Sequence, residues 1–260
     1  MAFRSLEFSR AARFNSALSS DFLDICESSL DAAILDSRSA VSHRTFAPSS
    51  MYCPLLQWFR LRGATPDKID KPDRGLEFTA VVGTACHEYL QHALSQHYQS
   101  DWLDVGEYLS TIYPADSYNV KKSKNGFESL VELYDPPVRF AVDGLLNLDV
   151  VTLLEIKSSE HDSFSEMYEP KSRHIDQVIT YCTLLHINRV LFVYIDRQYG
   201  DLKAFQYDVK DYEKERIQQT FAIVRDGVET NIAPEGLPKG DTRCSSNMCP
   251  YYKKCKQWRV

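Results

Sequence analysis

The chain has 260 residues, of which 43% are hydrophobic and 25% are charged, so it can bury a sizeable core as one large domain or two small ones. The net charge of -6 gives no overall sign of a nucleic-acid partner. No apolar run approaches the length of about 20 residues that a membrane-spanning helix needs. The first residues lack the apolar segment of a signal peptide. We therefore expect a cytoplasmic protein with no membrane partner.

Helical periodicity dominates the first hundred residues. Residues 16–36 carry apolar side chains at helical spacing, and a short helix begins near Pro54, whose ring suits a first turn. A long helix is expected from Phe78 to about Gln99. The residues from 120 to 126 read V-K-K-S-K-N-G and are typical of an exposed basic turn.

The second half begins with strand signals, which are apolar, β-branched runs bounded by turn residues. A helix is expected from about His174 to Ile187, a further helix ends near Val228, and the tail from Asn231 is predicted to be a loop. The order is helix, three strands, helix, strand, which is an α/β arrangement with additions at both ends. The predicted strands are 128–134, 138–148, 150–156, 189–196 and 202–209.

Two acids and a lysine stand in the central pair of strands. Because side chains alternate along a strand, Glu155 and Lys157 point to one face, and Asp143 lies in the preceding strand. Burying a carboxylate without a partner costs several kcal/mol, so these charges are poor candidates for fold-making residues. A bound divalent metal ion would resolve this conflict, and a plain ion pair between Glu155 and Lys157 is the alternative.

An acid two residues before a lysine occurs four times in the chain, so the pattern alone means little. The pair Glu169 and Lys171 encloses a proline, which a central strand would not accept, and the pair starting at Asp201 begins in a turn. The pair starting at Asp208 has an acid twelve residues upstream, the same separation as Asp143 and Glu155. Flanking residues must therefore decide.

Only the Asp143 region is bracketed by two distinctive helices. The helix before it contains His87, and the helix after it contains Gln177 and Tyr181, which are four residues apart and share a face. This order resembles the PD-(D/E)XK nuclease superfamily, and within it the RecB-like group, whose pattern is G-x-x-x-H, G/V-x-D, D/E-x-K and Q-x-x-x-Y. The matching segments are Gly83 to His87, Val142-Asp143-Gly144, Glu155-Ile156-Lys157 and Gln177 to Tyr181.

The resemblance covers about residues 78–200 and implies an α-β-β-β-α-β core with a mixed central sheet flanked by helices. It implies that Asp143, Glu155, His87 and the main-chain carbonyl of Ile156 hold one or two Mg²⁺ or Mn²⁺ ions. Carboxylate and carbonyl oxygens are the ligands that these cations prefer. By the same resemblance, Lys157 orients the attacking water and offsets charge in the transition state. Gln177 and Tyr181 would position DNA or the lysine.

Seven cysteines without an export signal argue against a disulfide framework. Cys26, Cys86 and Cys182 lie among apolar residues of predicted helices, where cysteine behaves as a small hydrophobe. The remaining four are candidate ligands, because four thiolates suit an iron-sulfur cluster or Zn²⁺. They are Cys53, Cys244, Cys249 and Cys255.

This arrangement of one early and three late cysteines resembles the iron-sulfur nucleases of the RecB-like group, including the CRISPR-associated exonucleases and the AddB nuclease domain. In those proteins a [4Fe-4S] cluster joins the two ends of the chain. Their first two late cysteines are commonly three residues apart, whereas Cys244 and Cys249 are five apart. Zn²⁺ therefore remains the alternative to a [4Fe-4S] cluster.

We accordingly expect a single nuclease domain over residues 1–260, with a helical extension (1–75), a nuclease core (76–230) and a Cys-rich tail (231–260). The expected activity is metal-dependent hydrolysis of DNA, as an exonuclease on single-stranded or resected ends in recombination, repair, phage DNA metabolism or CRISPR adaptation. The alternative is a non-catalytic iron-sulfur subunit of a helicase-nuclease or integration complex, which binds DNA or a protein partner. The expected protein partner is a recombination, helicase or CRISPR-adaptation protein.

Local basic residues are candidate contacts to DNA phosphates, although scattered lysines equally serve solubility. Tyr52 and Trp58 are candidate stacking residues for unpaired bases, with core packing favoured for Trp58. The candidate phosphate contacts are Lys121, Lys122, Lys124, Lys253, Lys254 and Lys256.

Overall fold

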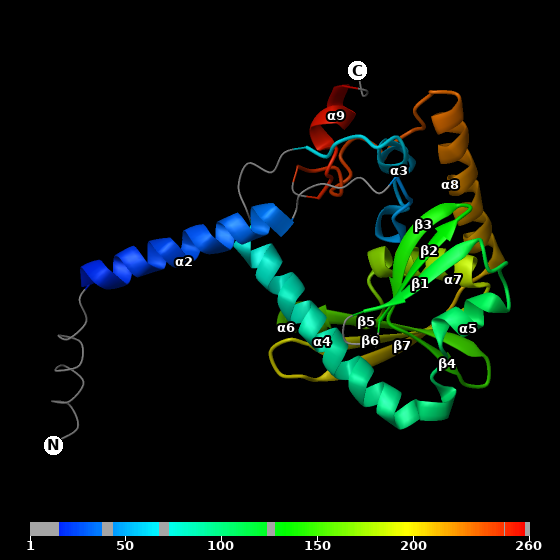
Figure 1. Ribbon diagram of the computed structural model, residues 1–260, viewed down its shortest axis with the longest axis horizontal. Coiled ribbons are helices and arrows are strands. Elements are labelled where there is room, and N and C mark those ends of the chain that lie inside the picture. Colours follow the sequence, from blue (N-terminus) through cyan, green and yellow to red (C-terminus); the bar gives the residue numbers. More distant parts are fainter. Residues whose placement is uncertain (1–15, 38–43, 68–72, 124–127, 247, 258–260) are drawn as a thin grey trace. The chain divides into compact units, whose positions relative to one another are not determined.

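The computed structural model describes residues 16–37, 44–67, 73–123, 128–246 and 248–257 (Figure 1). These residues divide into two compact units. The smaller unit lies within residues 1–40 and 68–79, and the larger lies within residues 41–67 and 80–260. In the part of the chain that the structure describes, no helix is both long and apolar enough to cross a bilayer.

The smaller unit contains α2 (Ser16–Ser37) and the first turns of α4 (Arg74–Tyr98). Both helices are close to the predicted ranges. Arg74 connects them, because its guanidinium lies 2.6 Å from a carboxylate oxygen of Asp31 and 3.0 Å from one of Glu27. Several apolar side chains of α2, including Phe22 and Ile25, are exposed.

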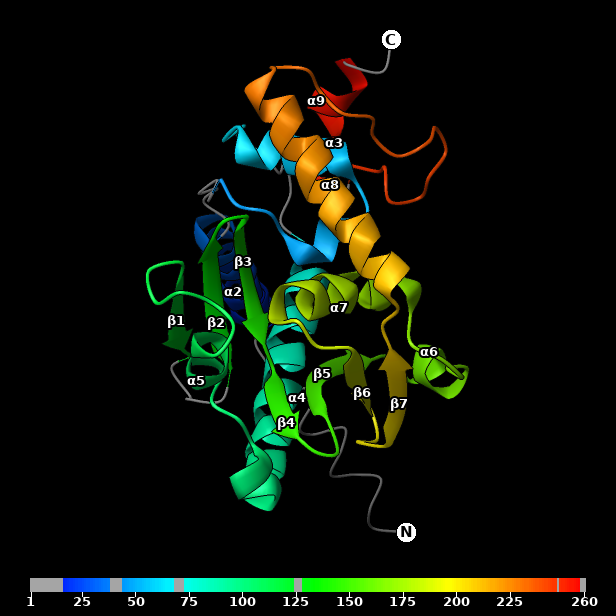
Figure 2. The same cartoon turned by 90° about the vertical axis from the view of Figure 1, so that its right-hand side faces the viewer.

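The described strands of the larger unit form two sheets surrounded by helices, a mixed α/β arrangement as predicted (Figure 2). The first sheet is antiparallel and contains β1 (Tyr118–Lys122), β2 (Ser129–Tyr134) and β3 (Pro137–Val142). The sequence predicted an exposed turn where β1 lies. That prediction was wrong for residues 120–122, because Val120 pairs with Val131 while the two lysines of β1 stay exposed.

The second sheet has the order β4-β5-β6-β7, formed by β4 (Gly144–Asn147), β5 (Val151–Ser159), β6 (Arg189–Asp196) and β7 (Leu202–Asp208). Strands β5 and β6 are parallel, whereas the β4-β5 and β6-β7 pairs are antiparallel. The sheet is therefore mixed. Its parallel pair places the carboxyl ends of β5 and β6 side by side.

The predicted strand 138–148 is interrupted at Asp143, and its halves belong to different sheets. Strand β3 pairs with β2 as far as Val142, and β4 pairs with β5 from Gly144 onward. A Cβ atom at Gly144 would lie 2.8 Å from the ring of Trp102, so the chain can pass here only because this residue has no side chain. Asp143 consequently sits at the junction of the two sheets.

Helix α7 (Ser172–Leu185) contributes to the centre of the core. Val178, Ile179 and Cys182 are fully buried and belong to the same cluster as Phe192 of β6. Helix α8 (Asp211–Glu229) packs on α7 and on α3 (Pro54–Leu61). Shorter helices are η1 (Pro48–Ser50), η2 (Gln99–Asp101), α5 (Val105–Ser110), α6 (His161–Ser165) and α9 (Tyr252–Gln257).

At the two ends of the chain, the structure confirms core packing for Trp58 and differs from the prediction for the tail. Trp58 is buried and donates a hydrogen bond from Nε1 to the carbonyl of Gly227 at 2.8 Å, so it belongs to the core rather than to a stacking surface. The tail is not entirely a loop, because α9 forms where Tyr251 is buried against Phe59 with the ring centres 5.2 Å apart. This stacking anchors the tail to α3.

Candidate active site

Asp143 is held in place by two elements of the larger unit. One carboxylate oxygen accepts the main-chain N–H of Ile156 at 2.8 Å, and the other lies 3.3 Å from Nδ1 of His87 on α4. The carbonyl oxygen of Asp143 accepts a hydrogen bond from the side-chain amide of Gln91 at 2.9 Å. These contacts join the sheet junction to α4 and to β5.

The Asp143 carboxylate is buried but ionised. Burial opposes ionisation, yet the hydrogen bond with His87, the charges of His87 and Lys157 and the Ile156 N–H together hold the pKa of Asp143 below its usual value. A buried anion of this kind needs a cationic neighbour, and the Lys157 ammonium group is one.

Glu155 and Lys157 project from the same face of β5, as the alternation of the strand predicted, and their charged ends are in contact. Burial raises the pKa of Glu155 to about 7, with the nearby charge of Asp143 acting in the same direction and Lys157 opposing it. Burial lowers the pKa of Lys157, but Glu155 and Asp143 outweigh burial and raise it overall. The lysine thus stays charged beside two acids of unequal strength.

The two carboxylates fit a divalent cation by the chemistry of their donor set. Mg²⁺ is commonly held by one or two carboxylates and keeps several water ligands. Among the described residues, no group of three or more His, Cys, Asp or Glu side chains is arranged to hold a metal ion. His87 is directed at Asp143, so the fit is to a two-carboxylate site that leaves other positions to water, main chain or substrate.

Helix α7 places Gln177 and Tyr181 next to this acidic centre. The Gln177 amide donates to the hydroxyl of Tyr181 at 2.6 Å, and the Tyr181 ring stacks on Phe140 with the centres 5.1 Å apart. Burial, together with Glu155, raises the pKa of Tyr181 well above its usual value. The sequence predicted that Gln177 and Tyr181 share a helix face, and in the structure Tyr181 is also part of the core.

The structure also brings up side chains that the sequence reading did not single out. Gln91 lies four residues after His87 on the same helix face, so that spacing could have found it. The pKa of Glu128 is raised by burial and by Asp143, which places a third acid near the centre.

Tyr194 pairs in parallel register with Lys157, and His174 lies 2.7 Å from the Tyr194 hydroxyl. These last contacts depend on strand pairing, which local sequence does not reveal.

The four outer cysteines lie in one neighbourhood of the larger unit. Burial raises the pKa of Cys53, and Cys244 and Cys255 raise it further. Burial also raises the pKa of Cys249 to about 11, with contributions from Cys53, Cys255 and Cys244. In the described part of the chain these thiols are not arranged as a metal-binding group. The four thiols are therefore gathered in one region without forming a ligand arrangement.

The predicted DNA-contacting lysines that the structure describes come from two elements, β1 and α9. Lys122 is engaged with Asp104 at 2.9 Å and with Ser129 at 3.1 Å, Lys121 is exposed, and Lys254 contacts the Thr65 carbonyl. Lys124 and the side chain of Lys256 lie outside the described residues.

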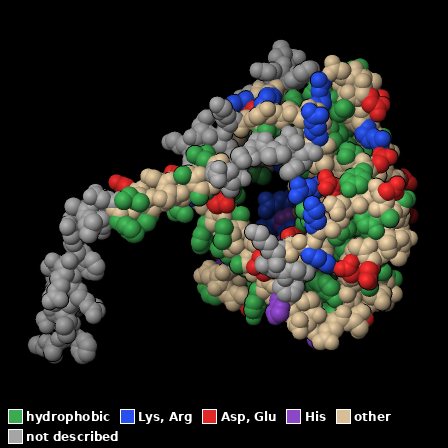
Figure 3. All heavy atoms as spheres, viewed as in Figure 1, with side chains coloured by type: hydrophobic (Ala, Val, Ile, Leu, Met, Phe, Trp, Pro, Cys, Tyr) green, Lys and Arg blue, Asp and Glu red, His purple; other side chains and the backbone are tan. Residues whose placement is uncertain are grey.

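The Lys253 main-chain N–H donates to Asp67 at 2.7 Å. On the face in Figure 3, basic side chains occur in small groups among uncharged and acidic ones. That face alone does not identify a nucleic-acid surface.

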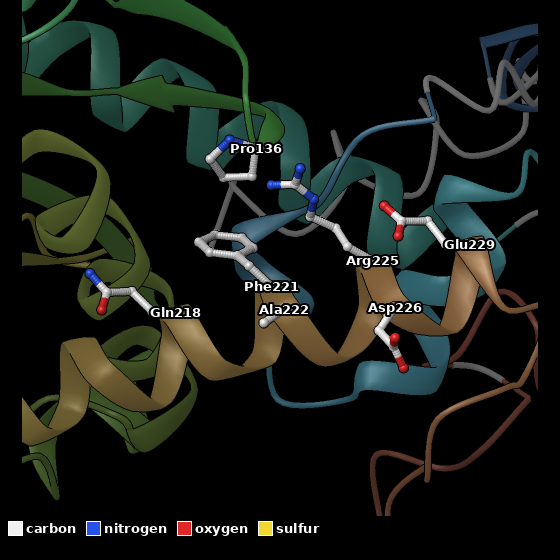
Figure 4. A pocket seen from close by; sticks show the side chains of 7 residues that line it. All are labelled: Pro136, Gln218, Phe221, Ala222, Arg225, Asp226 and Glu229. Atoms are coloured by element: carbon white, nitrogen blue, oxygen red, sulfur yellow. The ribbon is translucent and has the colours of Figure 1, made fainter.

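A cavity of about 400 Å³ lies along α8 and contains none of the predicted site residues (Figure 4). Phe221 and Arg225 of α8 line it together with Pro136 from the β2-β3 turn. Arg225 is paired with Asp135 at 2.7 Å. This hollow has no chemical link to the acidic centre.

No protein-family model and no curated protein matches the chain. Among solved structures, SSO0001 is similar at 14% identity and a TM-score of 0.45, covering 89% of this chain and 96% of that chain. An alkaline exonuclease from Laribacter hongkongensis, LHK-Exo, is similar at 14% identity and a TM-score of 0.43, covering 79% and 94% of the two chains. Its complex with dAMP gives 15% identity and a TM-score of 0.40, covering 69% and 79%. These similarities are too low to assign a function, so an assignment must rest on the site.

Proposed function

We propose that this protein is a metal-dependent DNA nuclease that hydrolyses phosphodiester bonds. The observation that carries the proposal is the convergence at the sheet junction of two buried carboxylates, Asp143 and Glu155, with the ammonium group of Lys157. A core made only for stability has no need of such an arrangement, because each buried charge costs free energy. A phosphodiester and a divalent cation are the partners that this charge pattern suits.

Asp143 and Glu155, with the main-chain carbonyl of Ile156, would hold one or two Mg²⁺ or Mn²⁺ ions. Bound there, the metal would polarise the phosphate and lower the pKa of a bound water molecule. His87 keeps the Asp143 carboxylate oriented through the contact at 3.3 Å. The Ile156 N–H holds the other oxygen of Asp143 at 2.8 Å, so the carboxylate is oriented before any cation arrives.

Lys157 supplies positive charge at the reacting phosphate. Hydrolysis forms a bond from the water oxygen to phosphorus and breaks the bond to the leaving sugar oxygen, and negative charge grows on the phosphoryl oxygens. An ammonium group that is already charged and fixed beside Glu155 can stabilise that charge with little reorganisation. The Gln177-Tyr181 pair would then position either the lysine or the strand.

The substrate we propose is a single-stranded or resected DNA end, which the protein would shorten as an exonuclease. The biological settings that such an activity would serve are recombination, repair, phage DNA metabolism and CRISPR adaptation. A helicase, recombination or CRISPR-adaptation protein would be the matching partner.

We further propose that Cys53, Cys244, Cys249 and Cys255 hold a structural [4Fe-4S] cluster, with Zn²⁺ as the alternative. Support comes from the gathering of the four thiols between α3 and the tail. The pKa of Cys249 is raised by the other three thiols, and the pKa of Cys53 is raised by two of them. Ligation would replace the thiol protons, whose loss burial currently disfavours. A cluster there would fasten the tail to α3.

The test is digestion of end-labelled single-stranded and double-stranded DNA in Mg²⁺ or Mn²⁺. Asp143→Asn, Glu155→Gln and Lys157→Met preserve side-chain size while removing charge. Asp149→Asn is a matched control, because Asp149 is an exposed acid paired with Arg189. We expect short products from the wild type and the control and none from the three site variants. Equal digestion by all proteins would refute the site, and wild type that binds DNA without cleaving it would indicate a non-catalytic subunit.

A further inference from the structure

A cavity of about 730 Å³ lies at the start of α7, outside the residues assigned so far. Lys171 and Arg173 line it from the first turn of α7, and Asp241 and Arg243 line it from the cysteine-rich tail. Its lining therefore contains two more cations than anions. An excess of positive charge in a hollow of this size attracts an anionic ligand, because the concave wall focuses the field.

The positive charge in this cavity is only partly neutralised. Asp241 holds Arg243 by two hydrogen bonds, at 2.9 and 2.7 Å. Within the described residues, neither the Lys171 ammonium nor the Arg173 guanidinium forms an ion pair. Burial and the charge of Arg173 lower the pKa of Lys171, which is the response expected of a cation among other cations.

An aromatic ring and a second hollow adjoin the basic cavity. The guanidinium of Arg243 lies over the ring of Tyr52, 4.6 Å from its centre. Arg243 also lines a neighbouring cavity of about 210 Å³, together with Tyr52 and with Arg216, which is paired there with Asp176 at 3.0 Å. Cationic groups that alternate with an aromatic ring along a groove are typical of surfaces that bind unpaired nucleic acid.

The basic cavity is tied to the acidic centre through Tyr194. The main-chain N–H of Lys171 donates to the Tyr194 hydroxyl at 3.2 Å, and Nδ1 of His174 lies 2.7 Å from the same oxygen. Tyr194 stands beside Lys157 in the parallel pairing of β5 and β6. The first turn of α7 therefore starts next to the strand that carries the proposed catalytic lysine.

We propose that the Lys171-Arg173-Arg243 cavity binds the sugar-phosphate backbone of an unpaired DNA strand next to the nucleotide that is cleaved. This inference rests on the proposed nuclease function and adds the path of the strand. A strand fits better than a small anion, because the cations lie on two walls of the cavity and Arg243 and Tyr52 join it to the second cavity. The cysteine-rich tail then has a further role, since Arg243 immediately precedes Cys244 and forms one wall of the path.

The test measures binding of a fluorescein-labelled oligothymidylate of about 20 nucleotides, longer than the site size of a single-strand binding groove. Fluorescence anisotropy in EDTA prevents cleavage. The variants are Lys171→Gln with Arg173→Gln, and Arg243→Gln alone. The control is Lys214→Gln with Arg225→Gln, which removes the same charge from α8, where Arg225 pairs with Asp135.

We expect the Lys171/Arg173 variant to bind at least tenfold more weakly and the control to stay within twofold of the wild type. Each lost phosphate contact on a single strand lowers the slope of log affinity against log salt by about 0.7, so the double variant should lose about 1.4. Arg243→Gln should lose about half of that slope. A misfolded fraction would reduce the anisotropy amplitude and leave the slope unchanged, so the slope separates lost contacts from lost fold.

Three outcomes would overturn the proposal. If the groove variants and the control bind equally while wild type still cleaves DNA, the strand path is wrong and the proposed function stands. If affinity depends only on a terminal phosphate and not on strand length, the cavity binds an end group rather than a backbone. If wild type binds no DNA and cleaves none, both the path and the nuclease function fall.

Discussion

The acidic centre and the cysteine-rich tail are both assembled from distant parts of the sequence, but they differ in how completely the protein forms them. At the acidic centre, Asp143 is held by Ile156, His87 and Gln91 through specific polar contacts. At the tail, Cys53, Cys255 and Cys244 raise the pKa of Cys249, but the thiols have no ligand arrangement among the described residues. The first region is organised by the chain itself, whereas the second would be completed only by the proposed ligand.

Because of this difference, the proposed cation and the proposed cluster should affect the protein in different ways. A cation that enters a prearranged site adds charge for chemistry and little to the fold. A cluster that completes a gathered set of thiols contributes its binding free energy to folding. Losing the divalent metal should therefore abolish activity with the fold intact, whereas losing the cluster should destabilise the tail.

The largest expected effect is on cleavage at the acidic centre. Asp143→Asn and Lys157→Met should each lower the cleavage rate by about 10³-fold, the scale seen when a group that stabilises developing charge is removed. The circular dichroism spectrum should be unchanged. A rate within tenfold of wild type for either variant would show that the centre is a structural ion pair.

The second effect is on stability at the tail. Cys249→Ser and Cys53→Ser should each remove the bound metal and lower Tm by on the order of 10 °C, equivalent to a few kcal/mol for a chain of this size. Visible absorption and metal analysis report the ligand, and calorimetry reports Tm. Cys26→Ser on α2 is the control, because that thiol belongs to the smaller unit. An unchanged Tm with unchanged metal content would mean that the four thiols bind nothing.

The third effect is a pH dependence at His174 of α7, whose imidazole contacts the Tyr194 hydroxyl. Burial lowers the pKa of His174 from 6.5 to about 3, so the unfolded chain binds this proton more readily than the folded protein. Stability is therefore complete above pH 6.5 and is lost as pH falls toward 3. Because His174 is partly exposed, we expect a loss of about 1–2 kcal/mol between pH 6.5 and 5.

Urea unfolding at several pH values measures this loss. His174→Gln keeps an acceptor for Tyr194 but does not titrate, so its stability should change less over the same pH range. His97→Gln, at the exposed end of α4, should retain the wild-type dependence. Parallel curves for His174→Gln and wild type would show that folding does not lower the pKa of His174.

The smallest expected effect concerns the support of Asp143. Gln91→Leu removes the hydrogen bond to the Asp143 carbonyl and leaves that buried oxygen without this donor, which costs about 1–3 kcal/mol. Cleavage should fall by roughly tenfold, less than in the Asp143 variant, because the carboxylate keeps its contacts with Ile156 and His87. Chemical unfolding and cleavage rates measure the two quantities. An unaffected cleavage rate would show that α4 plays no part in positioning the acid.

The parts of the fold that could be predicted are those that follow from local periodicity in the sequence. The helix α4, the alternation of Glu155 and Lys157 on β5 and the range of β6 follow from spacing within one element. The break at Asp143 could not be predicted, because residues 138–148 are apolar on both sides of it. The break arises because β3 pairs with β2 whereas β4 pairs with β5, and this change of partner depends on tertiary structure.

The same distinction applies to the site. His87, Asp143, Glu155 and Lys157 were named from their order along the chain, and the structure places them together. Tyr194 escaped notice because its relation to Lys157 exists only through the parallel pairing of β5 with β6. Strand β1 was missed because its lysines suggested a turn, whereas Tyr118 and Val120 are the side chains that pack.

The most direct test of the central claim is Mn²⁺ binding followed by electron paramagnetic resonance, with DNA absent. The account predicts that wild type binds Mn²⁺ and that Asp143→Asn combined with Glu155→Gln binds none, while Cys249→Ser retains Mn²⁺ binding. Binding of Mn²⁺ by the Asp143/Glu155 double variant with the affinity of wild type would contradict the account.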